Sequence, residues 1–224
     1  MAIIHNTTLK PTKLELLTTW LPTRPWYTGT GTPELTKAGG FRLDDPEGEV
    51  GIEFMVAVDS SGPEPVAYLV PLTYRAAPLP GADHALVGTM EHGVLGARWA
   101  YDGIHDPVLR TELLALLEGR AQAMAQSISA TPDHEVTHSY AGPGLPTGPA
   151  EVTEVTEVTE VTEVTEDQDG TRLALPDGTV LRLHRRPGHT APEGAVGQVS
   201  GAFDAPDGTR ARAVFVSLRT VPKD

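Results

Sequence analysis

Residues 88–108, GTMEHGVLGARWAYDGIHDPV, decide the fold of the N-terminal half of this chain. The alternating runs 85–90 and 94–101 flank the turn residues Glu91-His92-Gly93, a pattern that predicts a β-hairpin. Asp106-Pro107 follows the hairpin directly. Aspartate is a favoured N-cap and proline suits the first helical position, so this pair predicts the start of a helix.

The helix that begins at Pro107 is expected to be long. Leucines and other apolar residues recur at helical spacing as far as residue 128, and Thr131-Pro132-Asp133 follows as a stop. We therefore predict a helix over 107–128, long enough to brace a sheet. Asp102-Gly103, just before it, is predicted to form a turn.

Upstream of the hairpin, the sequence predicts one short helix and three strands. Residues 2–8 read as a strand, and the leucines that follow Pro11 at helical spacing indicate a short helix that Pro22 ends. Alternating apolar residues over 52–58 and 66–74 predict two strands, with 60–65 as the turn between them.

The composition changes after residue 130. GPGLPTGP at 142–149 forms no regular element, and the tract from 151 repeats Glu-Val-Thr with a period of three, which fits neither a helix nor a strand. We predict a disordered acidic linker over 130–170. Two Pro-Asp-Gly-Thr turns in the remaining residues predict a β-hairpin module over 171–222.

Charge and composition exclude several classes of protein. The net charge is −13, and eight of these negative charges lie in residues 151–169, which contain no lysine or arginine. No basic stripe is present, so we expect no nucleic-acid partner. The chain has no cysteine and no apolar run long enough to span a membrane. We expect a cytoplasmic protein without a cofactor.

His134-Glu135-Val136-Thr137-His138 is the clearest catalytic motif in the sequence. Two histidines at this spacing bind Zn²⁺ when they share one face of a helix, with the glutamate as general base. Here Pro132 and Gly142 leave little room for a helix, and no third ligand is evident. We therefore keep His134, Glu135 and His138 as a weak metal candidate and expect no metal site.

The aromatic residues offer a second kind of site. Trp26, Tyr27 and Trp99 could stack on sugar rings, although the low aromatic content favours a role in the core. Gly29 and Gly31 lie in a Gly-Thr-Gly-Thr sequence that lacks the spacing and the lysine of a phosphate loop, so they indicate a turn.

Asp102, His105 and Asp106 could form an acid–base or metal cluster. The structural interpretation is stronger, because Asp102-Gly103 fits a turn and Asp106-Pro107 fits a helix start. We therefore assign Asp102, Asp106 and Pro107 to a structural motif and name no catalytic residue.

Two stretches carry a resemblance to a known family. TKLELLTTWLPTRPWYTGTGT at 12–32 and RWAYDGIHDP at 98–107 resemble the N-terminal cap of bacterial maltokinases and related amino-sugar kinases. Thr30 stands where that family usually has a lysine. The resemblance covers about residues 1–129 and implies an α+β module that packs on an ATP-binding lobe without being catalytic itself.

Together these features predict an α+β fold, an antiparallel sheet braced by one short and one long helix, with a small β-hairpin sheet after it. The predicted parts are a cap-like domain at 1–129, the linker at 130–170 and the hairpin module at 171–222. The sequence favours a non-catalytic accessory protein of α-glucan, maltose or amino-sugar phosphorylation. Its expected partner is a sugar kinase, a glucan-metabolising enzyme or a second copy of itself. The alternatives are a carbohydrate-binding module and an enzyme, either a sugar kinase or a zinc hydrolase.

Overall fold

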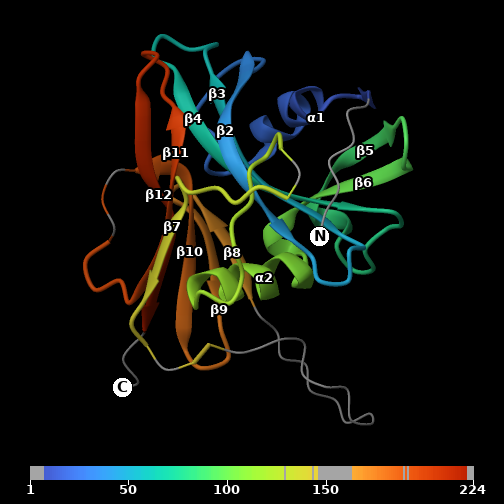
Figure 1. Ribbon diagram of the computed structural model, residues 1–224. Helices are drawn as coiled ribbons and strands as arrows, with labels where there is room; N and C mark the ends of the chain where they lie inside the picture. The colour runs from blue at the N-terminus through green and yellow to red at the C-terminus, as the bar shows by residue number, and fades with distance from the viewer. Residues whose placement is uncertain are drawn as a thin grey trace.

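The computed structural model describes residues 8–128, 130–142, 144–145, 163–188, 190 and 192–220. Within them, a large antiparallel sheet is combined with two α-helices, so the predicted α+β class is confirmed (Figure 1). The helices are α1 (Lys13–Trp20) and α2 (Pro107–Leu117), and short 3-10 turns lie at Leu21–Thr23, Asp83–Ala85 and Gly103–His105. The strands are β1 (Leu9–Lys10), β2 (Leu35–Asp44), β3 (Gly51–Asp59), β4 (Val66–Arg75), β5 (Leu86–His92), β6 (Gly96–Asp102), β7 (Thr137–Tyr140), β8 (Val164–Asp167), β9 (Gly170–Ala174), β10 (Thr179–Gly188), β11 (Gly197–Asp204) and β12 (Arg210–Thr220).

One continuous sheet joins the cap-like part to the C-terminal hairpins. Its strand order is β1-β5-β6-β4-β3-β2-β11-β12-β10-β9-β8, and β7 pairs with β11 off this path. The step from β2 to β11 is a single residue pair, Gly39 with Phe203. The sheet folds back on itself, so that β10 also contacts β4. The C-terminal strands thereby lie against the cap-like strands, as Figure 1 shows.

Helix α1 covers one face of the cap-like sheet. A capping box starts it: the Thr12 side chain accepts a hydrogen bond from the Glu15 backbone, and the Glu15 side chain accepts one from the Thr12 backbone. Leu17 and Trp20 are buried and pack with Tyr68 of β4. Burial of side chains of this size contributes about 2 kcal/mol each.

The C-terminal strands and α2 cover the opposite face. Phe41 of β2 stacks on Phe54 of β3 with ring centroids 4.5 Å apart, and on Phe215 of β12 at 6.3 Å. Four leucines of α2 join the same core: Leu109, Leu113, Leu116 and Leu117. Strand β3 is buried at every residue after Gly51, because both of its faces are covered by other parts of this chain.

The four predicted hairpins are confirmed, and one local detail differs. Proline cannot donate to a strand ladder and favours edges or bulges, yet Pro71 lies in β4, which has β3 on one side and β6 on the other. The pairing of β4 with β6 begins only at Leu72. The missing N–H of Pro71 therefore does not interrupt that ladder.

The prediction of a long helix over 107–128 is wrong, because α2 ends at Leu117. Gly119 adopts a left-handed conformation (φ 74°) that stops the helix. Farther along, the backbone of Met124 exchanges hydrogen bonds of 2.8 and 2.9 Å with Arg42 of β2. Met124 therefore pairs with the sheet beyond the end of α2, and Ile128 is exposed.

The predicted linker at 130–170 contains strands at both ends. Strand β7 pairs with β11, and β8, which belongs to the acidic repeat, pairs with β9. Residues 146–162, in its middle, lie outside the described residues, as do residues 2–7 of the predicted first strand. No helix among the described residues is long and apolar enough to cross a membrane.

Candidate functional site

A buried group of charged residues lies where the C-terminal strands meet the cap-like part. We call it the Arg185 cluster: Trp26, Asp102, Glu166, Thr171 and Arg185. Arg185, on β10, is fully buried and donates hydrogen bonds to the Asp102 carboxylate on β6 and to Thr171 Oγ1 at 2.7 Å. Its guanidinium carbon lies 4.7 Å from the ring centre of Trp26, a cation–π contact.

Glu166 brings the acidic repeat into this cluster. Its Oε1 atom accepts a hydrogen bond of 2.9 Å from the Trp26 indole and lies 3.4 Å from Arg185 Nη2. Its other oxygen lies 3.5 Å from Arg24 Nη1. Glu166 therefore holds the end of the repeat to the segment after α1 through Trp26 and Arg24, and to β10 through Arg185.

The Arg185 cluster is closed to solvent at its centre. Asp102 is 1% exposed and Arg185 is 0% exposed, so neither charge reaches a molecule outside the protein. Within the described residues, Asp102 Oδ1 and Arg185 Nη1 have no hydrogen-bond partner. A buried ion pair that loses one member leaves an uncompensated charge. The arrangement therefore holds two parts of the chain together and is not suited to acid–base catalysis.

Asp106 performs two tasks at the start of α2. It is fully buried and accepts a 3.0 Å hydrogen bond from the Val108 backbone, which confirms the predicted N-cap with Pro107 at the first helical position. Both of its oxygens also accept hydrogen bonds of 2.7 Å from Arg75 of β4. Asp106 therefore joins the start of α2 to β4.

His105 lies at the edge of this region beside His84. Their ring nitrogens Nδ1 and Nε2 are 3.2 Å apart. Burial lowers the pKa of His105, with Asp102 acting in the opposite direction and His84 adding to the decrease. Because Asp102 pairs with Arg185 and Asp106 pairs with Arg75, the structure does not join Asp102, His105 and Asp106 into one catalytic group.

The three aromatic residues considered for sugar binding do not form one platform. Trp26 is fully buried between Trp20, Tyr68 and Arg185, so no ring face is open to a sugar. This burial departs from the predicted binding role of Trp26. Its indole N–H is also already used by Glu166, a partner that sequence spacing could not indicate.

Tyr27 and Trp99 lie in separate surroundings. The Tyr27 hydroxyl donates a hydrogen bond of 2.9 Å to Asp59, and burial together with this carboxylate raises the pKa of Tyr27 to about 12. Trp99, on β6, is half-buried in a different apolar cluster with Tyr101. A carbohydrate platform of Trp26, Tyr27 and Trp99 is therefore not assembled.

Gly29 and Gly31 lie in the loop between the first 3-10 turn and β2. A side chain at Gly29 would meet the hydroxyl of Tyr27 at 2.0 Å, whereas one at Gly31 would meet open space. Position 29 therefore requires glycine, because the Tyr27 ring lies too close to the backbone for a side chain.

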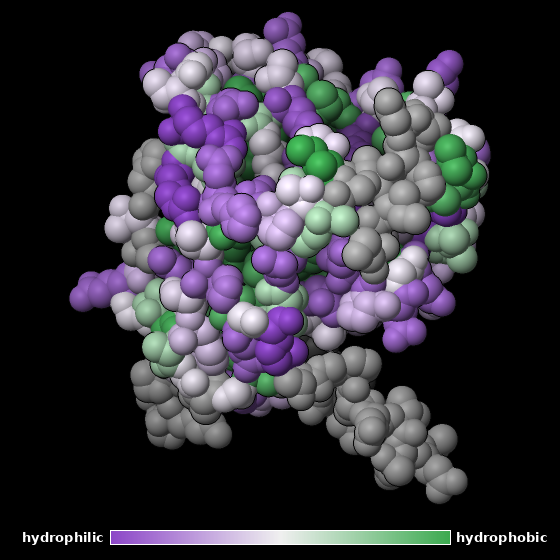
Figure 2. All heavy atoms as spheres, viewed as in Figure 1, coloured by the Kyte–Doolittle hydropathy of each residue, from purple (hydrophilic) through white to green (hydrophobic). Residues whose placement is uncertain are grey.

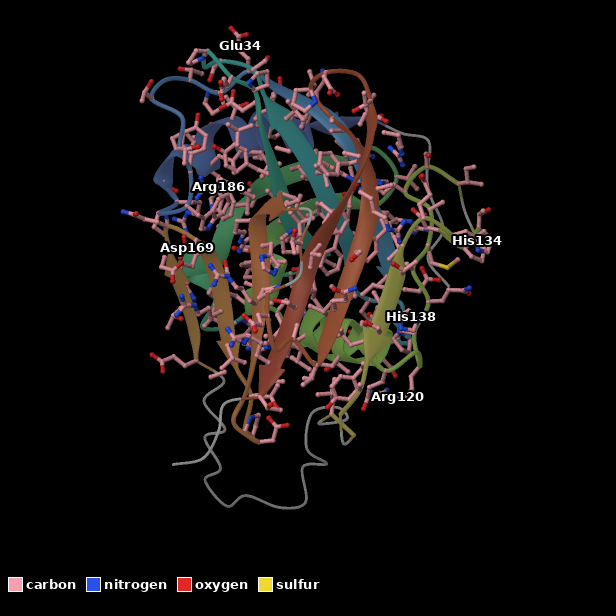
Figure 3. The ribbon with its side chains drawn as sticks, turned by 90° about the vertical axis from the view of Figure 1, so that its left-hand side faces the viewer. Glu34, Arg120, His134, His138, Asp169 and Arg186 are labelled. Carbon is pink, nitrogen blue, oxygen red and sulfur yellow. The ribbon has the colours of Figure 1, made fainter. Side chains whose placement is uncertain are left out.

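The histidine motif lies partly on a strand and not on a helix. Figure 3 shows His134, His138 and Arg120 on the same side of the molecule. His138 belongs to β7, and Glu135 accepts hydrogen bonds from Arg210, which lower the pKa of Glu135. A hollow of about 440 Å³ between α2 and β7 is lined in part by His134 and His138. Among the described residues, no group of three or more His, Cys, Asp or Glu could hold a metal ion.

Sequence reasoning missed Arg185 and Glu166. The strand alternation that places Leu181 and Leu183 inward also places Arg185 inward, so the burial of Arg185 could have been inferred. The role of Glu166 had no comparable signal, because the period of the repeat matches no regular element.

The comparisons with known proteins agree with the fold of the N-terminal half. Among curated proteins, no match to this chain was found. Residues 20–106 match a family model described as the maltokinase N-terminal cap domain, which spans the loop with Trp26, strands β2 to β6 and Asp106. Residues 20–106 are therefore similar to a maltokinase N-terminal cap domain.

Proposed function

We propose that the chain is a non-catalytic accessory protein that binds an enzyme of α-glucan, maltose or amino-sugar phosphorylation through its cap-like domain. The observation that carries this proposal is the closure of the cap-like sheet by the chain itself. Both faces of β3 are covered, and the carboxylates of the RWAYDGIHDP motif are used in internal ion pairs.

The burial of these carboxylates supports a role without catalysis. A general acid or base has to come within hydrogen-bond reach of its substrate. Asp102 faces Arg185 and Asp106 faces Arg75, and both carboxylates are at most 1% exposed. Their charges stabilise the fold and are not presented to a substrate.

The residues of the sequence support the same conclusion. Phosphoryl transfer of the kinase type uses a lysine on the phosphates, a catalytic aspartate, and an asparagine and an aspartate on the metal ions. The printed sequence contains one asparagine, Asn6, far from any catalytic-loop pattern. Of its four lysines, Lys10, Lys13 and Lys37 lie in the N-terminal part of the chain and Lys223 at its end.

The tip of the β5–β6 hairpin is the surface that we assign to the partner. Among the described residues, the exposed large hydrophobic side chains are Val94, Leu95 and Ile128, and the first two are neighbours at this tip. Figure 2 shows hydrophobic residues at the right-hand edge, where Figure 1 places the hairpin. Exposed apolar side chains at a projecting hairpin suit insertion into a partner's groove.

Two measurements on the purified chain test this proposal. The first is ATP consumption with maltose or glucosamine, where we expect no turnover above the buffer rate. The second is affinity capture from an extract of the source cells, where we expect an identified sugar kinase or glucan-metabolising enzyme. The Val94→Ser/Leu95→Ser variant should lose this enzyme, whereas Ile128→Ser, the matched exposed control, should retain it.

Several outcomes would contradict the proposal. Sugar-dependent ATP consumption would assign a kinase activity to the chain. Equal capture of the enzyme by the hairpin variant would remove the tip from the interface. A particle mass of two chains that falls to one in the hairpin variant, with no carbohydrate enzyme captured, would show self-association in place of an enzyme partner.

A further inference from the structure

A cavity of about 630 Å³ opens beside the start of α1, away from the Arg185 cluster. It lies among β1, the first turn of α1, and the adjoining strands β2 and β3. Its size is within the range of small-molecule sites. The residues that line it are Thr8, Leu9, Lys10, Thr12, Lys13, Leu14, Lys37 and Met55.

All three lysines in the described part of the chain line this one cavity. The chain has thirteen arginines but only four lysines, and the fourth, Lys223, lies outside the described residues. Lys10 and Lys13 come from the start of the chain, whereas Lys37 comes from β2. The fold therefore gathers positive charge at one place on a protein whose net charge is −13.

A buried carboxylate below the cavity balances only part of this charge. Glu53 of β3 forms an ion pair with Lys13, and its other oxygen lies 3.8 Å from Lys37 Nζ. The Tyr74 hydroxyl donates to it at 2.8 Å and the Gln126 amide at 3.1 Å. Burial acts to raise the pKa of Glu53, but the two lysines and Tyr74 outweigh it and lower that pKa, so the carboxylate stays charged.

The cavity thus keeps an excess of positive charge. Lys13 and Lys37 lie beside Glu53, whereas the Thr12 hydrogen bonds and the charge of Lys10 lower the pKa of Glu15, so three lysines lie near two carboxylates. Burial lowers the pKa of Lys37, with Glu53 opposing this effect and Lys13 adding to it. An anion beside Lys37 would supply the charge compensation that Glu53 alone does not.

We propose that this cavity binds a small organic phosphate. The excess of positive charge favours an anion, and lysine binds phosphate as a point charge. Leu9, Leu14 and Met55 supply apolar surface for the body of the molecule. This site is independent of the proposed accessory role, because it uses neither the hairpin tip nor the Arg185 cluster.

Calorimetric titration at low salt tests the site with three defined probes: phenyl phosphate, inorganic phosphate and phenol. We expect phenyl phosphate to bind more tightly than inorganic phosphate, and phenol not to bind. Lys10→Gln/Lys37→Gln, which removes two ammonium groups but leaves the Lys13–Glu53 pair, should weaken phenyl phosphate by about tenfold or more. Thermal melts of this variant should stay close to those of the wild type, because Lys13 keeps its ion pair with the buried Glu53.

The control variant removes the same charge elsewhere. Arg186 and Arg219 are exposed on the C-terminal strands, so Arg186→Gln/Arg219→Gln should leave phenyl phosphate binding within about twofold of the wild type. If both double variants weaken phenyl phosphate binding equally, the effect comes from net charge alone and the proposed site is overturned. Absence of phenyl phosphate binding to the wild type, or equal affinity for inorganic phosphate, would also overturn it.

Discussion

Arg185 and Asp102 lie 83 residues apart in the sequence and form a buried ion pair that joins β10 to β6. One member comes from the cap-like domain and the other from the C-terminal strands. Because both are shielded from water, the pair fixes how these two parts of the sheet pack against each other.

Removal of one member of this pair should destabilise the whole protein. We expect Arg185→Met to cost about 3–5 kcal/mol, because Asp102 is left buried without its countercharge. Urea denaturation monitored by tryptophan fluorescence measures the change. Arg186→Met, at the exposed neighbouring position, should change stability by less than about 0.5 kcal/mol. Similar losses in both variants would show that the buried pair has no special role.

Substitutions of the last two glutamates of the repeat should have very different effects on stability. Glu166 accepts a hydrogen bond from the Trp26 indole, whereas Glu163 is exposed. Glu166→Val should cost about 1–3 kcal/mol and shift Trp26 emission, since it leaves a buried N–H unpaired. Glu163→Val provides the matched control, and we expect no change in its denaturation midpoint. If both variants behave like the wild type, Glu166 does not anchor β8.

Gly40 should tolerate no side chain. Its φ is 119°, and a Cβ there would lie 1.8 Å from the Phe54 carbonyl oxygen on the adjacent strand. Gly40→Ala should therefore lose more than about 3 kcal/mol or fail to fold. Gly31→Ala, where a Cβ meets nothing within 4 Å, should have the same melting temperature as the wild type. A stable Gly40→Ala protein would contradict the close approach of β2 to β3.

His184 should make stability fall in acid. Burial, helped by the nearby charge of Arg182, lowers its pKa from 6.5 to about 4. Between these two values the unfolded chain binds the proton more tightly, so stability is lost as pH falls from about 6.5 towards 4. The loss should be on the order of 2 kcal/mol. Thermal melts at pH 7 and pH 4.5 measure it.

His184→Gln serves as the comparison for this pH effect. Glutamine can keep a hydrogen bond to Ser217, which lies 2.8 Å from His184 Nε2, but it does not titrate. The variant should lose part of the acid sensitivity and keep the rest, since the pKa of His105 is also lowered. If the stability of the variant depends on pH as that of the wild type does, His184 is excluded as a source of the acid sensitivity.

Local patterns predicted the parts of the fold that local forces determine. The strand pairs at 52–58 with 66–74 and at 171–175 with 179–186 follow from alternation and turn residues, and Asp106 caps α2 as expected. The length of α2 was overestimated because apolar spacing continues past its end. Gly119, which stops the helix, was the available signal.

The candidate site depended on contacts between distant residues, which spacing does not reveal. Trp26 was a candidate for sugar binding, and its contacts with Arg185 and Glu166 come from residues more than a hundred positions away. The gathering of Lys10, Lys13 and Lys37 likewise depends on β2 lying beside α1. Composition showed that lysines are few, but only the fold shows that they converge.

The position of Glu166 at the end of a repeat has a consequence for how this gene can change. Residues 163–166 read Glu-Val-Thr-Glu, the same sequence as every earlier unit from 151 onward. Gain or loss of whole triplets would alter the length of the tract and still deliver an identical segment to β8. Copy number can therefore drift between relatives without loss of the buried glutamate, because the hairpin of β8 with β9 places Glu166 whatever the length of the tract before it.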